Sequence, residues 1–269
     1  MKWRSLFTKE WQATQFSYLL NLAGITAIYV FMYSFMERFP PLVFLFGMAM
    51  IVAHVIYMLV EVPSSLNKEW KQNTVHVWLN FPIAGWKLLS AKFIVTFIQF
   101  GFSLVYLMIV VYFFIVKART ILEQSGQSEM LTEITLMKEL YVQFSPLIFV
   151  FVSYGAILLG LVGLFLFLIA KMIRFGWILG IGIVVVFNYG LNWLRETAIY
   201  TTVTEWGLLV NIKDLPAGFS FEGDSESIMV ELGNELLVQI YTGQILVEML
   251  LIVGIFLFLS WIFDHKLQV

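Results

Sequence analysis

Six apolar segments, each long enough to cross a bilayer, constrain this chain more than any other feature of its sequence. They lie at Tyr18–Met36, Leu42–Val60, Phe93–Val116, Pro146–Ala170, Phe175–Trp193 and Gln244–Phe263. A helix of about 17–25 apolar residues crosses the hydrocarbon core, and a helix satisfies its own backbone hydrogen bonds there. The sequence therefore predicts an all-α membrane protein with six transmembrane helices in a single transmembrane domain, residues 1–269.

The composition agrees with a membrane protein and excludes several other classes. Only 13% of the 269 residues are charged and the mean hydropathy is +0.87, whereas soluble domains have about 25% charged residues. The absence of cysteine excludes disulfides and thiolate metal sites. A net charge of −2 gives no sign of nucleic-acid binding. The first apolar segment has no small-residue cleavage site close behind it, so we expect an uncleaved span.

Lysine and arginine predict the orientation of the six spans. The N-terminal segment and the pieces on its side of the membrane hold ten of these residues, whereas the longer pieces on the other side hold six. Basic residues gather on the cytosolic side. We therefore expect both termini in the cytosol.

The two long outer segments, residues 117–145 and 194–243, are acidic and carry twelve Asp and Glu residues. Within them, Glu129–Tyr141 and Ser227–Tyr241 have the pattern of short helices. The acidic residues would form a vestibule that favours cationic material, or simply a solvated surface. The sequence leaves both interpretations open.

The cytosolic segment between spans two and three, residues 61–92, has the pattern of an amphipathic helix over Glu69–Phe81. One face is polar, with Glu69, Gln72, Asn73, His76 and Asn80 at helical spacing, and the other is mostly apolar and includes Trp70 and Trp78. Pro82 ends the pattern, because proline disfavours helical geometry at the residue before it. We expect the apolar face to pack on the bundle and the polar face to meet a soluble partner.

The first seventeen residues, Met1–Ser17, predict an interfacial helix. Trp3, Phe7 and Trp11 lie at helical spacing, with basic residues elsewhere around the helix. Aromatic anchors and basic residues are typical of helices at the membrane–water interface. A mobile tail is the alternative.

Polar residues and glycines inside the spans are the remaining candidates for a site. His54 is either a neutral imidazole bonded between helices or a proton-coupling group, and the second role requires a charged partner at similar depth. It is also a candidate for the lining of a substrate path. Asn188 and Asn192, beside Phe187 and Trp193, would line a substrate path or hold helices together. Gly176 and Gly180 form a Gly-x-x-x-Gly pair, which predicts helix packing or a dimer seam.

No enzyme motif is visible in the chain. It has no G-x-x-x-x-G-K-[ST] phosphate loop, no His-Glu-x-x-His pair and no G-x-S-x-G elbow. We also saw no pair of carboxylates at membrane depth, and the three histidines are too scattered to hold a metal. A membrane chain with a contact helix and no catalytic group of its own implies an energy source on another subunit.

The arrangement resembles the type-2 permeases of ATP-binding cassette (ABC) exporters. Three features carry the resemblance: the N-terminal Met1–Ser17, the acidic Glu69 in NKEWKQNT, and LNFPIAGWKLLSAKF at Leu79–Phe93. The last is similar to the family pattern L-x-x-P-I-x-x-x-x-[IL]-L-x-x-K-[FY] before span three. Family members often have Gly and a second acidic residue after the Glu, whereas this chain has Lys71, Gln72 and Asn73.

The resemblance implies a transport mechanism with several subunits. Two permease chains, identical or paralogous, would enclose a path in the bacterial plasma (inner) membrane. Each would contact a separate ATPase subunit, which binds ATP and Mg, through a coupling helix that includes Glu69, Lys71, Gln72, Asn73, His76, Trp78 and Asn80. The permease itself would hold no cofactor and would not be an enzyme.

The cargo and the alternatives follow from the mostly apolar spans. We expect an amphipathic or hydrophobic cargo, with an antimicrobial or toxin peptide favoured and a lipid, a drug or a polysaccharide as alternatives. A different class of function is a non-transporting membrane scaffold or sensor whose cytosolic helix docks a regulator.

Overall fold

The computed structural model describes residues 3–36, 38, 40–72, 84–126, 128–211 and 239–266. Within these residues, six helices are long and apolar enough to cross a membrane: Trp3–Tyr33, Leu45–Lys71, Gly85–Ser125, Met130–Met172, Gly176–Arg195 and Thr242–His265. Each overlaps one of the six predicted spans. The prediction of a helical chain with six segments long and apolar enough to cross a membrane is therefore confirmed.

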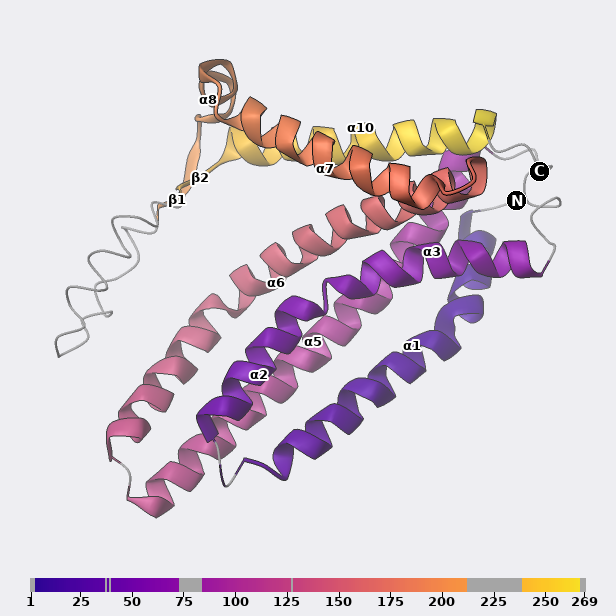
Figure 1. The fold of residues 1–269 in the computed structure, drawn as a ribbon. Coiled ribbons are helices and arrows are strands. Elements are labelled where there is room, and N and C mark those ends of the chain that lie inside the picture. The colour runs from indigo at the N-terminus through magenta and orange to yellow at the C-terminus, as the bar shows by residue number, and fades with distance from the viewer. Residues whose placement is uncertain are drawn as a thin grey trace. The chain divides into compact units, whose positions relative to one another are not determined.

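Eight helices and two short strands are described along the chain (Figure 1). The helices are α1 (Trp3–Tyr33), α2 (Pro40–Ala53), α3 (Ile56–Lys71), α5 (Gly85–Ser125), α6 (Ser128–Met172), α7 (Gly176–Arg195), α8 (Ala198–Thr204) and α10 (Thr242–Lys266), and the strands are β1 (Leu208–Asn211) and β2 (Gln239–Tyr241). The second span consists of α2 and α3. It is broken at His54–Val55, where two backbone N–H groups donate to the carbonyl three residues earlier instead of four.

Residue contacts divide the chain into two compact units. The first comprises Met1–Trp177 and Leu259–Val269, and the second comprises Ile178–Phe258. The first unit therefore holds α1 to α6 and the C-terminal turns of α10. The second holds most of α7 and α10, with α8 and the strands.

Helix α5 is the centre of the first unit. It packs against α1, α2, α3 and α6, and Phe100, Leu104 and Leu107 on it are fully buried. Figure 1 shows these helices side by side. Any side chain on the inner face of α5 therefore contacts other helices rather than lipid.

Glycines of α6 allow close packing against α3, as small residues do in membrane bundles. A Cβ on Gly163 would lie 2.6 Å from the Leu59 carbonyl oxygen and 3.1 Å from Pro63 Cγ. Pro63 has no N–H, so the Leu59 carbonyl one turn earlier lacks its usual helical donor. Close approach at Gly163 thus coincides with the weakened turn of α3.

The N-terminal segment differs from the expected interfacial helix. The break between Met1–Ser17 and the first span does not exist, because α1 runs without interruption from Trp3 to Tyr33. No proline occurs in this range to end the helix. Trp3 and Trp11 are exposed, and Trp3 lies 6.0 Å from Trp86 of α5, between ring centroids.

The segment 117–145, which we expected as an outer loop, is a helical hairpin. Helix α5 continues to Ser125, Gly126 turns the chain at φ +70°, and α6 begins at Ser128. The predicted helix over Glu129–Tyr141 is therefore real but is the first part of a longer helix. Pro146, where we expected the fourth span to begin, lies inside α6.

The described part of residues 194–243 contains α8 and an antiparallel pairing of β1 with β2. Leu208 pairs with Tyr241 and Asn211 with Gln239. The strands add a small sheet that we did not expect in an all-α protein, and they replace the last residues of the predicted helix Ser227–Tyr241. The rest of that prediction lies outside the described residues.

The α3–α6 contact predicts that Gly163→Ala destabilises the bundle. The new methyl group meets the Leu59 backbone, so we expect a loss of about 1–3 kcal/mol, seen as a lower Tm in detergent. Gly101→Ala is the control, because nothing lies within 4 Å of its Cβ position. Equal Tm changes for the two variants would contradict close packing at Gly163.

Candidate functional site

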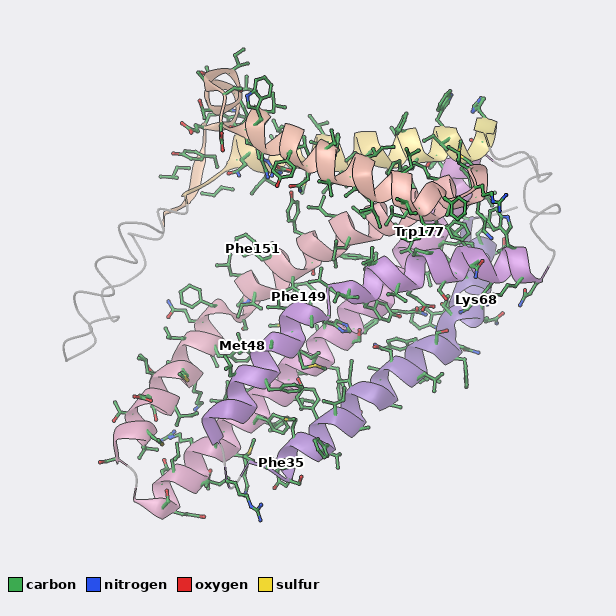
Figure 2. All side chains as sticks on the ribbon, viewed as in Figure 1. Phe35, Met48, Lys68, Phe149, Phe151 and Trp177 are labelled. Atoms are coloured by element: carbon green, nitrogen blue, oxygen red, sulfur yellow. The ribbon has the colours of Figure 1, made fainter. Side chains whose placement is uncertain are left out.

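A cluster of charged residues, the charged cluster, lies where the start of α1, the end of α3 and the start of α5 meet. It consists of Lys9, Glu10, Glu61, Lys68, Glu69 and Lys92. Three of its members are basic and three are acidic, so its formal charge is balanced. Figure 2 labels Lys68 near the C-terminal end of α3.

Lys92 is the centre of the charged cluster. Its side chain is only 3% exposed, and its Nζ lies 2.6 Å from Glu10 Oε2 and 3.4 Å from Glu69 Oε1. It also donates to the Ser65 carbonyl oxygen at 3.3 Å. A buried ammonium is tolerated only with such partners. Lys92 therefore ties α5 to both α1 and α3.

The outer members of the charged cluster extend the network. Lys9 Nζ donates to Glu69 Oε1 at 3.1 Å, and its side chain is 44% exposed. Lys68 lies 3.5 Å from Glu61 and donates to Ser17 of α1 at 3.0 Å. A cavity of about 180 Å³ is lined by cluster members together with Thr14, Ser65 and Gln72.

Polar residues continue from the charged cluster along the inner faces of the three helices, and we call this set the polar seam. Its members are Glu10, Thr14, Ser17 and Asn21 on α1, Tyr57, Glu61, Ser65 and Glu69 on α3 with His54 in the break just before it, and Lys92, Thr96, Gln99 and Ser103 on α5. Steps of three and four residues keep side chains on one face of a helix. Each helix thus presents one polar stripe.

Hydrogen bonds join the stripes at successive depths. Gln99 Nε2 donates to Thr14 Oγ1 at 2.8 Å. Further into the bundle, His54 Nε2 and Ser103 Oγ lie 2.7 Å apart. The His54 ring also stacks on Phe100, with 5.2 Å between centroids. The seam therefore runs from Lys92 to His54.

Five polar atoms of the seam are buried without a hydrogen-bond partner among the described residues. They are Glu10 Oε1, Asn21 Nδ2, Tyr57 OH, Thr96 Oγ1 and Gln99 Oε1. Each such atom costs about 1–3 kcal/mol if nothing else bonds to it. Most buried polar atoms in native proteins have a partner.

The connection between α3 and α5 is held at both of its flanks. Glu69, before it, and Lys92, after it, belong to the same charged cluster. The Gly85 N–H, at the start of α5, donates to both carboxylate oxygens of Asp264 on α10 at 2.9 and 3.1 Å. Trp70 packs edge-on against Phe167 of α6, with 5.2 Å between centroids.

The structure places the predicted coupling residues in two groups. Glu69 lies in the last turns of α3, a helix continuous with span two, and its side chain is buried in the charged cluster. Lys71 and Gln72 are exposed. Asn73, His76, Trp78 and Asn80 lie outside the described residues. Glu69 is thus turned toward the bundle rather than toward solvent.

The predicted substrate-path residues do not form one described site. His54 belongs to the polar seam in the first unit. Phe187, Asn188, Asn192 and Trp193 lie on exposed positions of α7 in the second unit, where the two Asn side chains bond to each other at 3.2 Å. This bond satisfies one donor of Asn192 and one acceptor of Asn188.

Gly176 has a local role that the Gly-x-x-x-Gly pattern did not reveal. A Cβ there would lie 2.2 Å from the Ile169 carbonyl oxygen, and Phe175 before it has φ +62°. Gly176 therefore permits the tight turn from α6 to α7. Gly180 is buried on α7, and its place in a dimer seam stays a prediction.

A smaller polar group lies in the second unit. Arg195 of α7 pairs with Glu248 of α10 at 2.5 Å, and Tyr200 of α8 donates to the same carboxylate at 3.4 Å. Burial, and then the Glu248 charge, raise the pKa of Tyr200. The phenol thus stays protonated and acts as a donor that holds α8 on α10.

The buried positions of Glu10, Glu61 and Lys92 were not expected from the sequence. We assigned Glu61 and Lys92 to the cytosolic segment 61–92 and made no prediction of burial for Glu10. The expectation that no carboxylate pair lies at membrane depth as an acid and a base stays a prediction. The repeated three- and four-residue spacing of polar residues beside three apolar segments is the signal that would have found them.

Comparisons with protein-family models, with curated proteins and with solved structures found no match. Among the residues that the structure describes, no three His, Asp or Glu side chains gather as a metal site would require.

The charged cluster predicts that Lys92→Met strongly destabilises the bundle, because it leaves Glu10 and Glu69 buried without their central ammonium. We expect a loss of about 3–5 kcal/mol, measured as a lower Tm in detergent. Adding Glu10→Gln should recover part of the loss. Arg119→Met is the control, because its partner Glu123 is exposed and such pairs contribute about 0–1 kcal/mol. Equal losses for Lys92→Met and Arg119→Met would contradict the central role of Lys92.

Proposed function

We propose that this chain is the membrane-spanning permease subunit of an ABC-type exporter. It moves an amphipathic cargo outward while a separate ATPase subunit hydrolyses ATP. The observation that carries the proposal is the anchoring of the connection between α3 and α5 at both flanks. The sequence resemblance over Met1–Ser17 and Glu69–Phe93 supports the same function.

A connection that transmits force needs a rigid base. The Lys92–Glu69 ion pair joins the two flanks to each other and, through Glu10, to α1. The hydrogen bonds between Gly85 and Asp264 connect the start of α5 to α10. The contact between Trp70 and Phe167 connects the end of α3 to α6. A partner that displaces the connection would therefore displace α1, α3, α5, α6 and the end of α10 together.

Rigid-body motion of packed helices is a common way to couple a remote event to a membrane path. In our proposal the polar face of residues 69–81 meets the ATPase subunit in the cytosol, and closure of that subunit on ATP moves the bundle. Glu69 then holds the connection between α3 and α5 on the bundle, from the membrane side. The direct contacts come from Gln72, Asn73, His76 and Asn80.

The proposed cargo is amphipathic rather than wholly apolar. The bundle has large exposed apolar faces, which suit the apolar side of such a cargo. The favoured cargo is an antimicrobial or toxin peptide with one polar and one apolar face. A second permease copy or a paralogue would complete the path, in the bacterial plasma membrane.

A membrane scaffold or sensor is the second candidate, and the same anchored connection favours it. A docked regulator would also act on α1, α3 and α5 through the charged cluster. The two functions differ in the partner that they require. Stimulation of an ATPase by this chain supports export, whereas binding of a kinase or another regulator without ATP hydrolysis supports sensing.

The proposal predicts that the double variant His76→Ala/Asn80→Ala uncouples the partner. The chain is reconstituted in liposomes with the phosphate-loop ATPase encoded beside it, and its stimulation of ATP hydrolysis is measured. We expect the double variant to lose most of this stimulation, because these residues form the predicted contact face. The buried charged cluster is unchanged, so Tm should match the wild type.

Matched changes on the opposite end of the bundle provide the control. Glu123→Ala and Thr120→Ala remove polar groups from the hairpin of α5 and α6 and should leave the stimulation intact. Wild-type stimulation by the His76→Ala/Asn80→Ala variant would contradict the coupling role. No stimulation by the wild-type chain would contradict the exporter function itself.

A further inference from the structure

We propose that the polar seam is a water-filled inlet that opens at the charged cluster and ends at the His54–Ser103 pair. Water, and protons carried by water, would thereby reach the interior of the membrane from one side only. The inference rests on the packing of α1, α3 and α5 and does not depend on what the protein transports.

The unpartnered atoms of the seam are the first argument. Glu10 Oε1 and Gln99 Oε1 are acceptors, whereas Thr96 Oγ1 and Tyr57 OH can both donate and accept. Water is the small molecule that satisfies donors and acceptors alike. Buried water normally bonds to such groups, and the cavity of about 180 Å³ lined by Glu10, Thr14 and Lys92 has room for several molecules at the charged end of the seam.

The depth of the seam is the second argument. Lys92 and Ser103 are eleven residues apart on α5, which corresponds to about 16 Å along a helix. The hydrocarbon core is about 30 Å thick. If Lys92 lies near its border, the His54–Ser103 pair therefore lies close to the middle of the membrane.

The break between α2 and α3 is the third argument. The helix is interrupted at His54–Val55, at the inner end of the seam. Irregular backbone at membrane depth occurs where it is buried in protein or lines a water-filled cavity. His54 is 8% exposed and bonds to Ser103, so the break has a polar neighbour rather than lipid.

Beyond Ser103 the same face of α5 becomes apolar, which closes the inlet. The next positions at helical spacing are Leu107 and Val111, and both are fully buried. Gly47 of α2 approaches Val111, where an added Cβ would lie 3.1 Å from its Cγ2. Tight apolar packing leaves no room for water. The seam therefore has one open end.

The natural absence of cysteine makes a direct test simple. Single cysteines replace Thr96 and Ser103 in the seam, Leu107 and Val111 beyond it, and Phe102 and Val105 on the exposed, lipid-facing side of α5. Membrane vesicles are treated on either side with a membrane-impermeant methanethiosulfonate. Lys71→Cys and Glu123→Cys, both at exposed positions, report the two sides of the membrane.

We expect Thr96→Cys and Ser103→Cys to react from the Lys71 side, at least about tenfold faster than the other four positions, because only a hydrated thiol forms the reactive thiolate. Comparable slow rates at Thr96, Ser103, Phe102 and Val105 would overturn the inlet. Fast reaction at Leu107 and Val111 would overturn its closed end. Wild-type Tm for Thr96→Cys and Ser103→Cys shows that fast labelling does not come from unfolding.

Discussion

The buried ion pairs of Lys92 with Glu10 and Glu69 are the interaction on which the rest of this structure depends. A charge inside a membrane bundle is costly unless an opposite charge lies beside it. Lys92 is almost fully buried, with Glu10 2.6 Å away on another helix. The pairs therefore fix the register of α1, α3 and α5. Every other polar contact of the seam, from Gln99–Thr14 to His54–Ser103, follows from that register.

The charged cluster and the polar seam give the bundle a rigid base at one end and a polar interior deeper in. At the open end, ion pairs hold the connection between α3 and α5 on a rigid base, as a mechanical contact requires. Deeper in the bundle, the same three helices bring unsatisfied polar atoms together around the break at His54. A movement of the connection would act directly on these helices. The lever of the proposed function and the inlet of the further inference are thus parts of one helical unit.

The spans were predictable because each depends on local composition, whereas the charged cluster was not. Glu10, Glu61 and Lys92 each stand at the edge of an apolar segment, where a charged residue normally faces water. Glu10 and Lys92 are 82 positions apart in the sequence, and no local pattern pairs them. The continuous α1 and the long α5–α6 hairpin were also missed, because charged residues near a span suggest a loop although they are good helix formers.

The sequence alone determined six segments that are long and apolar enough to cross a membrane as helices, because length and local composition set that property. It also determined the polar stripes, because the spacing of residues along the sequence sets which of them share one face of a helix. Only the tertiary structure decided which stripes face each other, that Glu69 turns toward the bundle, and that Gly163 meets the Leu59 carbonyl. Those outcomes depend on packing between helices that are far apart in the chain. The free energy of each such contact depends on two residues, and the sequence around one of them does not identify the other.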